Sequence, residues 1–303
     1  MVRLNFLKIG FVLLSLIFFT ACHEKKVEKS VFIKPVGTNR QTFQVKGVIK
    51  ELKPDGKTAT IKHETIPDYM PAMTMDFEVK NSNELKGFKA GDAISFRMVV
   101  ADDQGWIEQL KKIGAASPAE FPSRETIRVA RDVEPLKIGD ILPEYHFTNE
   151  LGQSVNLSQF KGNAIAFTFI FTTCPFPNFC PRMSSNFAET QKKLSEIKNS
   201  PTNWHLFSIS FDPEKDVPEV LKTYAQKYKY DPRHWSFLTG ELIDITAIAQ
   251  QFGQTFWREG ESINHNLRTV VIDASGRVTK IIPNEKWTSD ELVEEIVKAA
   301  GEK

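Results

Sequence analysis

The chain has 303 residues, which is enough for about two domains of ordinary size. Apolar residues make up 41% and charged residues 25%, the composition of a protein that folds around its own hydrophobic core. The 39 basic residues are balanced by 38 acidic ones, so the basic excess typical of a nucleic-acid-binding protein is absent. The chain has only three cysteines, which excludes a scaffold held by many disulfides.

The N-terminus has the pattern of an export signal. Two basic residues precede an apolar run, Ile9–Ala21, that is too short to span a membrane and fits a signal peptide. The run ends in Phe19-Thr20-Ala21-Cys22, which resembles a bacterial lipobox with phenylalanine in place of the usual leucine. We predict a lipoprotein signal peptide over residues 1–21 and a lipid on Cys22. An ordinary signal peptide or a short N-terminal anchor is the alternative.

Residues 22–40 are polar, rich in lysine and without a hydrophobic pattern, so we expect them to form a tether. The protein would then lie in the cell envelope, anchored to the membrane by its lipid and facing the periplasm or the exterior. Cysteines in such a compartment can form disulfides.

Residues 41–112 have the pattern of a small all-β domain. Apolar and polar residues alternate over Thr42–Ile49, as in a half-buried strand, and Pro54-Asp55-Gly56 is a strong turn signal. Four more short strands are predicted at Thr58–Lys62, Met73–Val79, Ala93–Val100 and Trp106–Lys112. Five strands in so few residues favour a closed, OB-like barrel.

The pattern changes after residues 113–136, which read as an interdomain linker, and residues 137–303 form a second block. Apolar runs typical of strands buried on both faces occur at Ala164–Phe171, His205–Phe211 and Thr269–Ile272. Helices are predicted at Ser184–Ile197, Pro218–Tyr228, Leu242–Phe252 and Ser289–Ala300, with Ser289 as the cap of the last one. Strands alternating with helices indicate an α/β domain with parallel strand pairs.

Cys174 and Cys180 lie between a predicted buried strand and the following helix. A helix N-terminus stabilises the thiolate, which is the form that binds metal ions and attacks disulfides. A structural disulfide is the alternative. In the chain-entropy model, however, a disulfide that closes so short a loop stabilises less than one closing a long loop. We therefore favour a functional role for this pair.

Residues 137–300 resemble the Sco/SenC copper chaperones. The matching phrases are Thr-Thr-Cys-Pro with Phe-Cys-Pro around the two cysteines, Ser208–Pro213 with Asp216, and Asn264-His265-Asn266 ahead of the last buried strand. The resemblance implies a thioredoxin-like fold in which Cys174, Cys180 and His265 bind copper and Asp212 lies close to the site. Two thiolates and an imidazole suit Cu(I) and can also hold Cu(II).

The cysteine spacing departs from the usual Cys-x-x-x-Cys of this family. Six residues of regular helix would point the two sulfurs about 240° apart, so the residues between them must loop out, as Pro175 and Pro177 favour. The same cysteines could form a redox disulfide, which makes a thiol-disulfide reductase acting on target cysteines the alternative function. The absence of Cys-x-x-Cys and of a proline just before Thr269 argues against it.

A second soft-metal motif lies in the all-β block. Three of the six methionines fall in Met70-Pro71-Ala72-Met73-Thr74-Met75, and His63 ends the preceding strand. Met73 and Met75 share one face of a strand, and thioethers are ligands that select Cu(I). A methionine-lined core is the alternative explanation.

Residues 47–112 resemble the periplasmic CusF-like copper-binding domain. The matching phrases are His63-Glu64-Thr65-Ile66-Pro67 and Pro71-Ala72-Met73-Thr74-Met75. The resemblance implies that His63, Met73 and Met75 bind Cu(I). A tryptophan often covers the copper in this family; Met70 stands in its place and is a candidate fourth sulfur ligand.

Two copper motifs on different folds predict one function, that of a membrane-tethered copper metallochaperone rather than an enzyme. The family resemblance implies copper-site assembly in cytochrome c oxidase, with the copper-site subunit or another copper acceptor as partner. A thiol reductant is a further expected partner, because Cys174 and Cys180 must be reduced to bind metal. A periplasmic copper-tolerance buffer is a further alternative. No nucleic-acid partner is expected.

Overall fold

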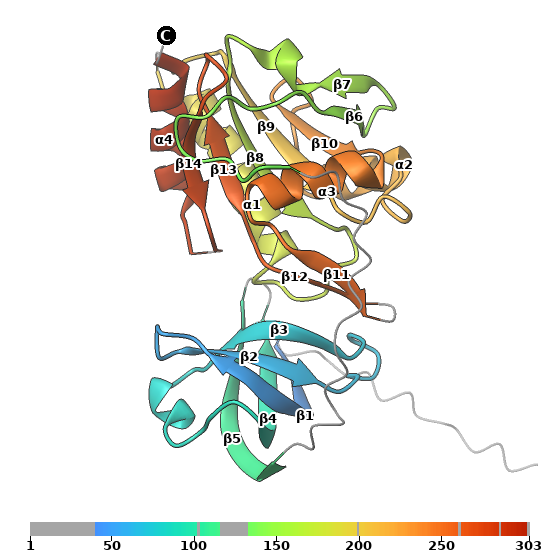
Figure 1. The fold of residues 1–303 in the computed structure, drawn as a ribbon, viewed down its shortest axis with the longest axis vertical. Helices are drawn as coiled ribbons and strands as arrows, with labels where there is room; N and C mark the ends of the chain where they lie inside the picture. The colour runs from blue at the N-terminus through green and yellow to red at the C-terminus, as the bar shows by residue number, and fades with distance from the viewer. Residues whose placement is uncertain are drawn as a thin grey trace, which may run out of the picture. The chain divides into compact units, whose positions relative to one another are not determined.

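The computed structural model describes residues 40–101, 104–115, 133–198, 200–259, 262–284 and 286–301 (Figure 1). The predicted signal peptide, the lipidated Cys22, the tether up to residue 39 and most of the predicted linker lie outside these residues. Within them, no helix is both long and apolar enough to cross a membrane.

Residues 41–115, called the β domain below, form a five-stranded antiparallel sheet. The strand order is β3-β2-β1-β4-β5, and a parallel bridge between Val79 and Ile107 joins the segment after β3 to β5. The five predicted strands are confirmed. The elements are β1 (Gln41–Leu52), β2 (Thr58–His63), β3 (Met73–Glu78), the 3-10 helix η1 (Ser82–Leu85), β4 (Asp92–Val100) and β5 (Gly105–Ala115).

Alternation of apolar and polar residues builds the core of the β domain. In β4, Ile94, Phe96 and Met98 are buried while the residues between them are partly exposed. Gly47 of β1 lies opposite His63 of β2, where an added Cβ would come within 2.8 Å of the Lys62 carbonyl oxygen. Glycine therefore allows the two backbones to approach closely beside His63.

Residues 133–301, called the C-terminal domain below, are built on a seven-stranded mixed sheet in the order β14-β13-β8-β9-β10-β6-β7. The predicted parallel pairing holds for β8, β9 and β10, and the other pairs are antiparallel. The strands are β6 (His146–Asn149), β7 (Ser154–Asn156), β8 (Ala164–Ile170), β9 (Trp204–Ser210), β10 (Trp235–Thr239), β11 (Phe256–Glu259), β12 (Ser262–His265), β13 (Thr269–Ile272) and β14 (Val278–Ile282).

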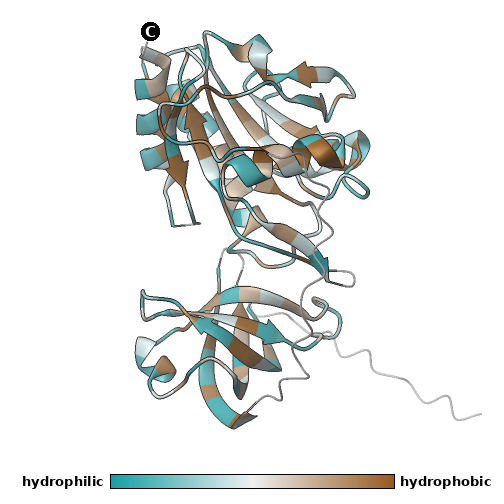
Figure 2. Cartoon of the chain, in the orientation of Figure 1, coloured by the Kyte–Doolittle hydropathy of each residue, from teal (hydrophilic) through white to brown (hydrophobic). Residues whose placement is uncertain are grey.

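The helices of the C-terminal domain cover the apolar sheet, whose hydrophobic strands Figure 2 shows in brown. They are η3 (Leu157–Phe160), α1 (Cys180–Glu196), α2 (Pro218–Gln226), α3 (Leu242–Gln251) and α4 (Ser289–Gly301). Every residue of β8 and β9 is buried, which explains their continuous apolar patterns. The hairpin of β11 and β12 forms a separate two-stranded sheet (Figure 1).

Two helix starts differ from the prediction. Helix α1 begins at Cys180 rather than Ser184, with Pro181 in the first turn, where its missing N–H costs no hydrogen bond. Helix α4 is capped by Thr288 instead of Ser289. The Glu291 N–H donates to Thr288 Oγ1 at 3.3 Å, and the Thr288 N–H donates to a Glu291 carboxylate oxygen at 2.7 Å.

Candidate metal sites

The structure brings Cys174, Cys180 and His265 together. Their ligand atoms, two sulfurs and one ring nitrogen, all lie within 4.8 Å of one another. Cys174 lies in the loop after β8, Cys180 is the first residue of α1, and His265 ends β12. Cys180 is buried, whereas Cys174 and His265 are half-buried, and both cysteines are free thiols.

The segment between the cysteines loops out, as the spacing predicted. Residues 174–179 are not helical. The Phe179 N–H donates a hydrogen bond to the Phe176 carbonyl oxygen at 3.2 Å, which closes a turn. This loop lets α1 begin at Cys180, whose backbone N–H hydrogen-bonds to the Cys174 sulfur, and a helix N-terminus favours thiolate. A regular helix across both cysteines would have separated the sulfurs.

Hydrogen bonding and packing orient the His265 ring. Its Nδ1 lies 2.9 Å from the Asn266 carbonyl oxygen, which can only accept, so Nδ1 carries the proton. In the neutral ring, Nε2 then offers its lone pair toward the cysteines, where a metal ion could bind. The rings of Phe171, Phe179 and Phe211 pack against the imidazole with centroids 5.0–5.7 Å away.

The two thiols differ in acidity. Burial alone would raise the pKa of Cys174, but hydrogen bonds with Cys180 and His265 outweigh it and hold that pKa below its ordinary value. Burial, and next the neighbouring Cys174 sulfur, raise the pKa of Cys180. Cys174 therefore forms its thiolate more readily than Cys180, and a metal ion bound by both sulfurs would displace the Cys180 proton.

Asp216 is a buried carboxylate that holds the segment leading to Cys174 by hydrogen bonds. It accepts hydrogen bonds from the Thr172 N–H at 3.0 Å, from the Thr172 hydroxyl and from the Ser210 hydroxyl at 2.6 Å. Burial raises its pKa, and its charge also acts to raise the pKa of Cys180. The sequence placed Asp216 in a motif but not among the site residues; its position after a buried strand was the available signal.

Asp212, the acidic residue predicted close to the site, follows β9 and is buried. Its carboxylate pairs with the Arg258 guanidinium at 2.6 Å. The preceding residue, Phe211, is one of the three phenylalanines whose rings contact His265. Asp212 therefore anchors the hairpin that carries Arg258 and His265.

The β domain gathers its three predicted ligands on two neighbouring strands. His63 pairs with Met73 across β2 and β3, and Met75 follows on the same face of β3. All three are buried, as is Met70, which lies in the turn before β3 and bridges to Ile66. The four side chains belong to the hydrophobic interior of the domain, where their sulfurs and ring nitrogen are shielded from water.

His63 carries a nitrogen with no partner. Its Nδ1 lies 2.7 Å from the Glu64 carbonyl oxygen, so the proton sits there, while the buried Nε2 has no hydrogen-bond partner among the described residues. Burial lowers the pKa of His63 and keeps the ring neutral. A buried unpaired nitrogen is costly and calls for an explanation.

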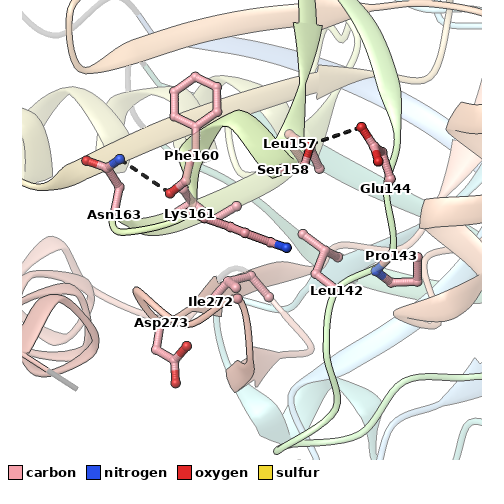
Figure 3. Close-up of a pocket in the computed structure, with 12 residues that line it drawn as sticks. Leu142, Pro143, Glu144, Leu157, Ser158, Phe160, Lys161, Asn163, Ile272 and Asp273 are labelled. Carbon is pink, nitrogen blue, oxygen red and sulfur yellow. Dashed lines mark hydrogen bonds between the residues drawn. The ribbon is translucent and has the colours of Figure 1, made fainter. Parts of the chain in front are cut away.

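A separate cavity of about 230 Å³ lies at the start of the C-terminal domain (Figure 3). Leu142, Lys161 and Asp273 are among its lining residues, and Ser158 donates a hydrogen bond to Glu144 at its edge. It has no cysteine, histidine or methionine in its lining, so we assign it no part in metal binding.

Comparison with known proteins identifies both domains. Residues 134–301 match the SCO1/SenC family model, and residues 42–112 match the model of the copper binding periplasmic protein CusF. The SCO1 protein homolog of Bacillus subtilis is 38% identical over 161 residues, covering 52% of this chain and 81% of that protein. The chain belongs to the SCO1/SenC family and carries a CusF domain on the N-terminal side of its SCO1/SenC domain.

Solved structures similar to this chain cover the same half of it. A SCO1/SenC family lipoprotein from Bacillus anthracis is 29% identical with a TM-score of 0.49, over 55% of this chain and 97% of that one. ScoI of Arabidopsis thaliana with copper bound is 22% identical with a TM-score of 0.46, over 54% and 98%. The predicted family resemblances, with copper as the metal that they imply, are confirmed.

Proposed function

We propose that this protein is a copper metallochaperone that supports assembly of the copper site in cytochrome c oxidase. The observation that carries the proposal is the cluster of Cys174, Cys180 and His265 within 4.8 Å. Two thiolates and a neutral imidazole bind Cu(I) and can also hold Cu(II). Cys174 and His265 remain half-exposed, so an acceptor protein can reach the bound ion.

The β domain is proposed to hold a second Cu(I) through His63, Met73 and Met75, with Met70 as a candidate fourth ligand. The unpaired, buried His63 Nε2 and the position of both thioethers on one strand face support it. We also propose that the sheet closes as an OB-like barrel. Support comes from the Lys80 N–H, which donates to the Ile107 carbonyl of β5 at 2.9 Å.

The cellular setting is part of the proposal. The signal pattern of residues 1–21 supports a lipid on Cys22, with the protein in the cell envelope facing the periplasm or exterior. The expected partners are the copper-site subunit of the oxidase or another copper acceptor, and a thiol reductant that keeps Cys174 and Cys180 reduced. Asp212 is proposed to support the site from outside by anchoring Arg258.

Thiol-disulfide exchange is the second candidate function. The lowered pKa of Cys174 favours its thiolate, and Cys180 lies close enough to resolve a mixed disulfide. In that reaction the two thiols lose two electrons and two protons to the disulfide of a target protein. The presence of a third ligand, His265, beside the two cysteines favours the metal function.

Titration of the reduced chain with Cu(I) tests the copper function. We expect about two Cu(I) per chain, one for each set of soft ligands. Cys174→Ser should abolish one site, and Met73→Ala should weaken the other. Met183→Leu is the matched control, because Met183 is a buried sulfur whose nearest polar contact is the Thr269 hydroxyl at 4.0 Å. A chain that binds copper equally well in all these variants would overturn the proposed ligand sets.

A further inference from the structure

The residues between the two cysteines reach into the β domain. Phe176 is 2% exposed and belongs to the hydrophobic core of that domain, where its ring contacts Phe77 at 5.7 Å between centroids. Asn178 is buried and makes two hydrogen bonds with Gly105 of β5. Its Oδ1 accepts from the Gly105 N–H, and its Nδ2 donates to the Gly105 carbonyl, both at 2.8 Å.

Gly105 fits the Phe176 ring. A Cβ on this glycine would lie 2.4 Å from Phe176 Cζ, a distance that real Cβ atoms do not adopt. The backbone of Gly105 is not in the left-handed region, so its own conformation does not require glycine. Glycine is needed at position 105 because any side chain there would occupy the space of the Phe176 ring, which comes from the C-terminal domain.

Two further contacts join the segments that carry the metal ligands. The Tyr69 hydroxyl donates to the Pro175 carbonyl at 2.9 Å, one residue beyond Cys174. The Thr74 N–H, between Met73 and Met75, donates to the side-chain oxygen of Asn264, the neighbour of His265. The turn that contains Met70 and the strand that contains Met73 and Met75 are therefore each hydrogen-bonded to a ligand-bearing segment of the other site.

A series of ring contacts links the two ligand histidines. His63 contacts Phe77 at 5.7 Å, and Phe77 contacts Phe176 at 5.7 Å. Phe176 contacts Phe179 at 5.6 Å, and Phe179 contacts His265 at 5.7 Å. Of the three phenylalanines in this series, Phe176 and Phe179 belong to the segment between Cys174 and Cys180.

A cavity of about 190 Å³ lies where the two ligand sets approach each other. Tyr69 and Met73 line it from the β domain, and Phe171 and Thr173 line it from the C-terminal domain, next to Cys174. Its walls therefore include a ligand of one site and the neighbours of a ligand of the other.

We propose that residues 175–179 are a docking element, which inserts Phe176 into the β domain and holds the two metal sites together for transfer of Cu(I) within one chain. The docking stands by itself, and the transfer rests on the proposed function. Transfer is a ligand exchange: copper bonds to His63, Met73 and Met75 break as bonds to both thiolates and His265 form. Copper remains Cu(I), and the Cys180 proton passes to water. Two anionic sulfurs hold Cu(I) more tightly than neutral thioethers, which sets the direction.

Amide hydrogen exchange in the reduced, metal-free full chain tests the docking. The reporter is the Thr74 amide, whose acceptor Asn264 lies in the other domain. Gly105→Ala should accelerate its exchange about tenfold or more, because the new methyl expels Phe176. Gly114→Ala is the matched control: it lies in the same strand with open space around it and no left-handed backbone. It should leave the Thr74 amide unchanged.

A double variant makes the test specific. Phe176→Ala alone should also accelerate Thr74 exchange, and adding Gly105→Ala to it should have no further effect, because the clashing ring is gone. Amides in the pairing of β1 with β4, such as that of Val45, report whether the β domain remains folded. Thr74 exchange that is unaffected by Gly105→Ala and Phe176→Ala, in folded protein, would overturn the docking.

A kinetic measurement tests the transfer. One equivalent of Cu(I) is added to the reduced chain, methionine methyl signals report the β-domain site, and thiolate-to-copper absorption reports the cysteine site. We expect a rate independent of protein concentration, and about tenfold slower transfer in Gly105→Ala. A rate that rises with protein concentration would refute transfer within the chain while leaving copper binding intact. Failure to bind copper at all would instead refute the proposed function and leave the docking result standing.

Discussion

The two proposed ligand sets of this protein suit the same metal, but their side chains differ in charge and in exposure to water. In the C-terminal domain the ligands are two ionisable thiols and a half-exposed imidazole at a helix start. In the β domain they are neutral thioethers and a neutral imidazole inside the core. Thiolates bind Cu(I) tightly, but they must lose their protons and must not be oxidised to a disulfide. Neutral thioethers bind more weakly, but they need no loss of a proton and cannot form a disulfide. The difference suits the β-domain site to receive copper and the C-terminal site to keep it until delivery.

The largest expected effect comes from removing one sulfur at each site. Cys180→Ser should weaken Cu(I) binding at the C-terminal site by more than about 100-fold, because a ligand counts for more than its supporting partners. Met75→Leu should weaken the β-domain site by only about tenfold, since a neutral thioether contributes less than a thiolate. Competition with a Cu(I) chelator measures both affinities. Equal losses at the two sites would remove the proposed contrast between charged and neutral sulfur.

A smaller effect is expected from Asp216→Asn. The amide cannot accept from all three donors that face the carboxylate, so we expect a loss of about 1–3 kcal/mol in the free energy of unfolding of the C-terminal domain. Urea unfolding followed by tryptophan fluorescence measures it. Glu214→Gln is the control on an exposed carboxylate, 82% accessible. If Asp216→Asn were as harmless as the control, the carboxylate would not be organising the cysteine segment.

Alkylation rates of the two thiols sharpen the contrast in charge. Because the pKa of Cys174 is lowered, its thiolate exists at neutral pH, and its alkylation should slow only as the pH falls through that lowered pKa. Because the pKa of Cys180 is raised, that thiol should react only at alkaline pH. His265→Ala removes a hydrogen bond that favours the Cys174 thiolate, so the pH below which alkylation of Cys174 slows should rise in this variant. Mass spectrometry assigns the modified cysteine; preferential modification of Cys180 would contradict the assignment.

The smallest expected effect concerns an exposed ion pair between the domains. Lys286 Nζ lies 3.0 Å from Asp55 and 3.4 Å from Glu78. All three side chains are accessible to water, so Lys286→Ala should cost about 0.5 kcal/mol of docking and about double the Thr74 exchange rate. High salt should have the same effect on the unmodified chain. A larger effect would mean that charge, rather than Phe176, holds the domains together.

Sequence patterns could predict much of the fold because burial leaves a periodic signature. The alternating strands of the β domain and the apolar runs of β8 and β9 were assigned correctly for that reason. Strands of three or four residues, such as β7 and β12, are too short to show a period. The start of α1 at Cys180 was missed because the prolines of the preceding loop favoured a helix boundary farther along the chain.

The metal sites were predictable only in part. The two cysteines could be recognised from their position between a buried strand and a helix. His265 reaches them through the hairpin of β11 and β12, and only the family resemblance could indicate that position. The role of Phe176 could not be predicted at all. An apolar residue in a loop has no periodicity, and its partner Phe77 lies in another domain. Such a contact depends on the tertiary structure and leaves no pattern in the local sequence.

The unpaired nitrogen of His63 has a consequence for the lifetime of the protein. In the metal-free β domain this buried polar atom has no partner among the described residues, and the Cu(I) proposed above would provide one. Under that proposal, bound Cu(I) would stabilise the folded domain by mass action, and the metal-free form would open more often. Proteases and chaperones that act on opened chains would remove empty carriers first, so the number of surviving molecules would follow the supply of metal. Thermal melting with and without Cu(I) measures this coupling directly, and an unchanged melting temperature would exclude it.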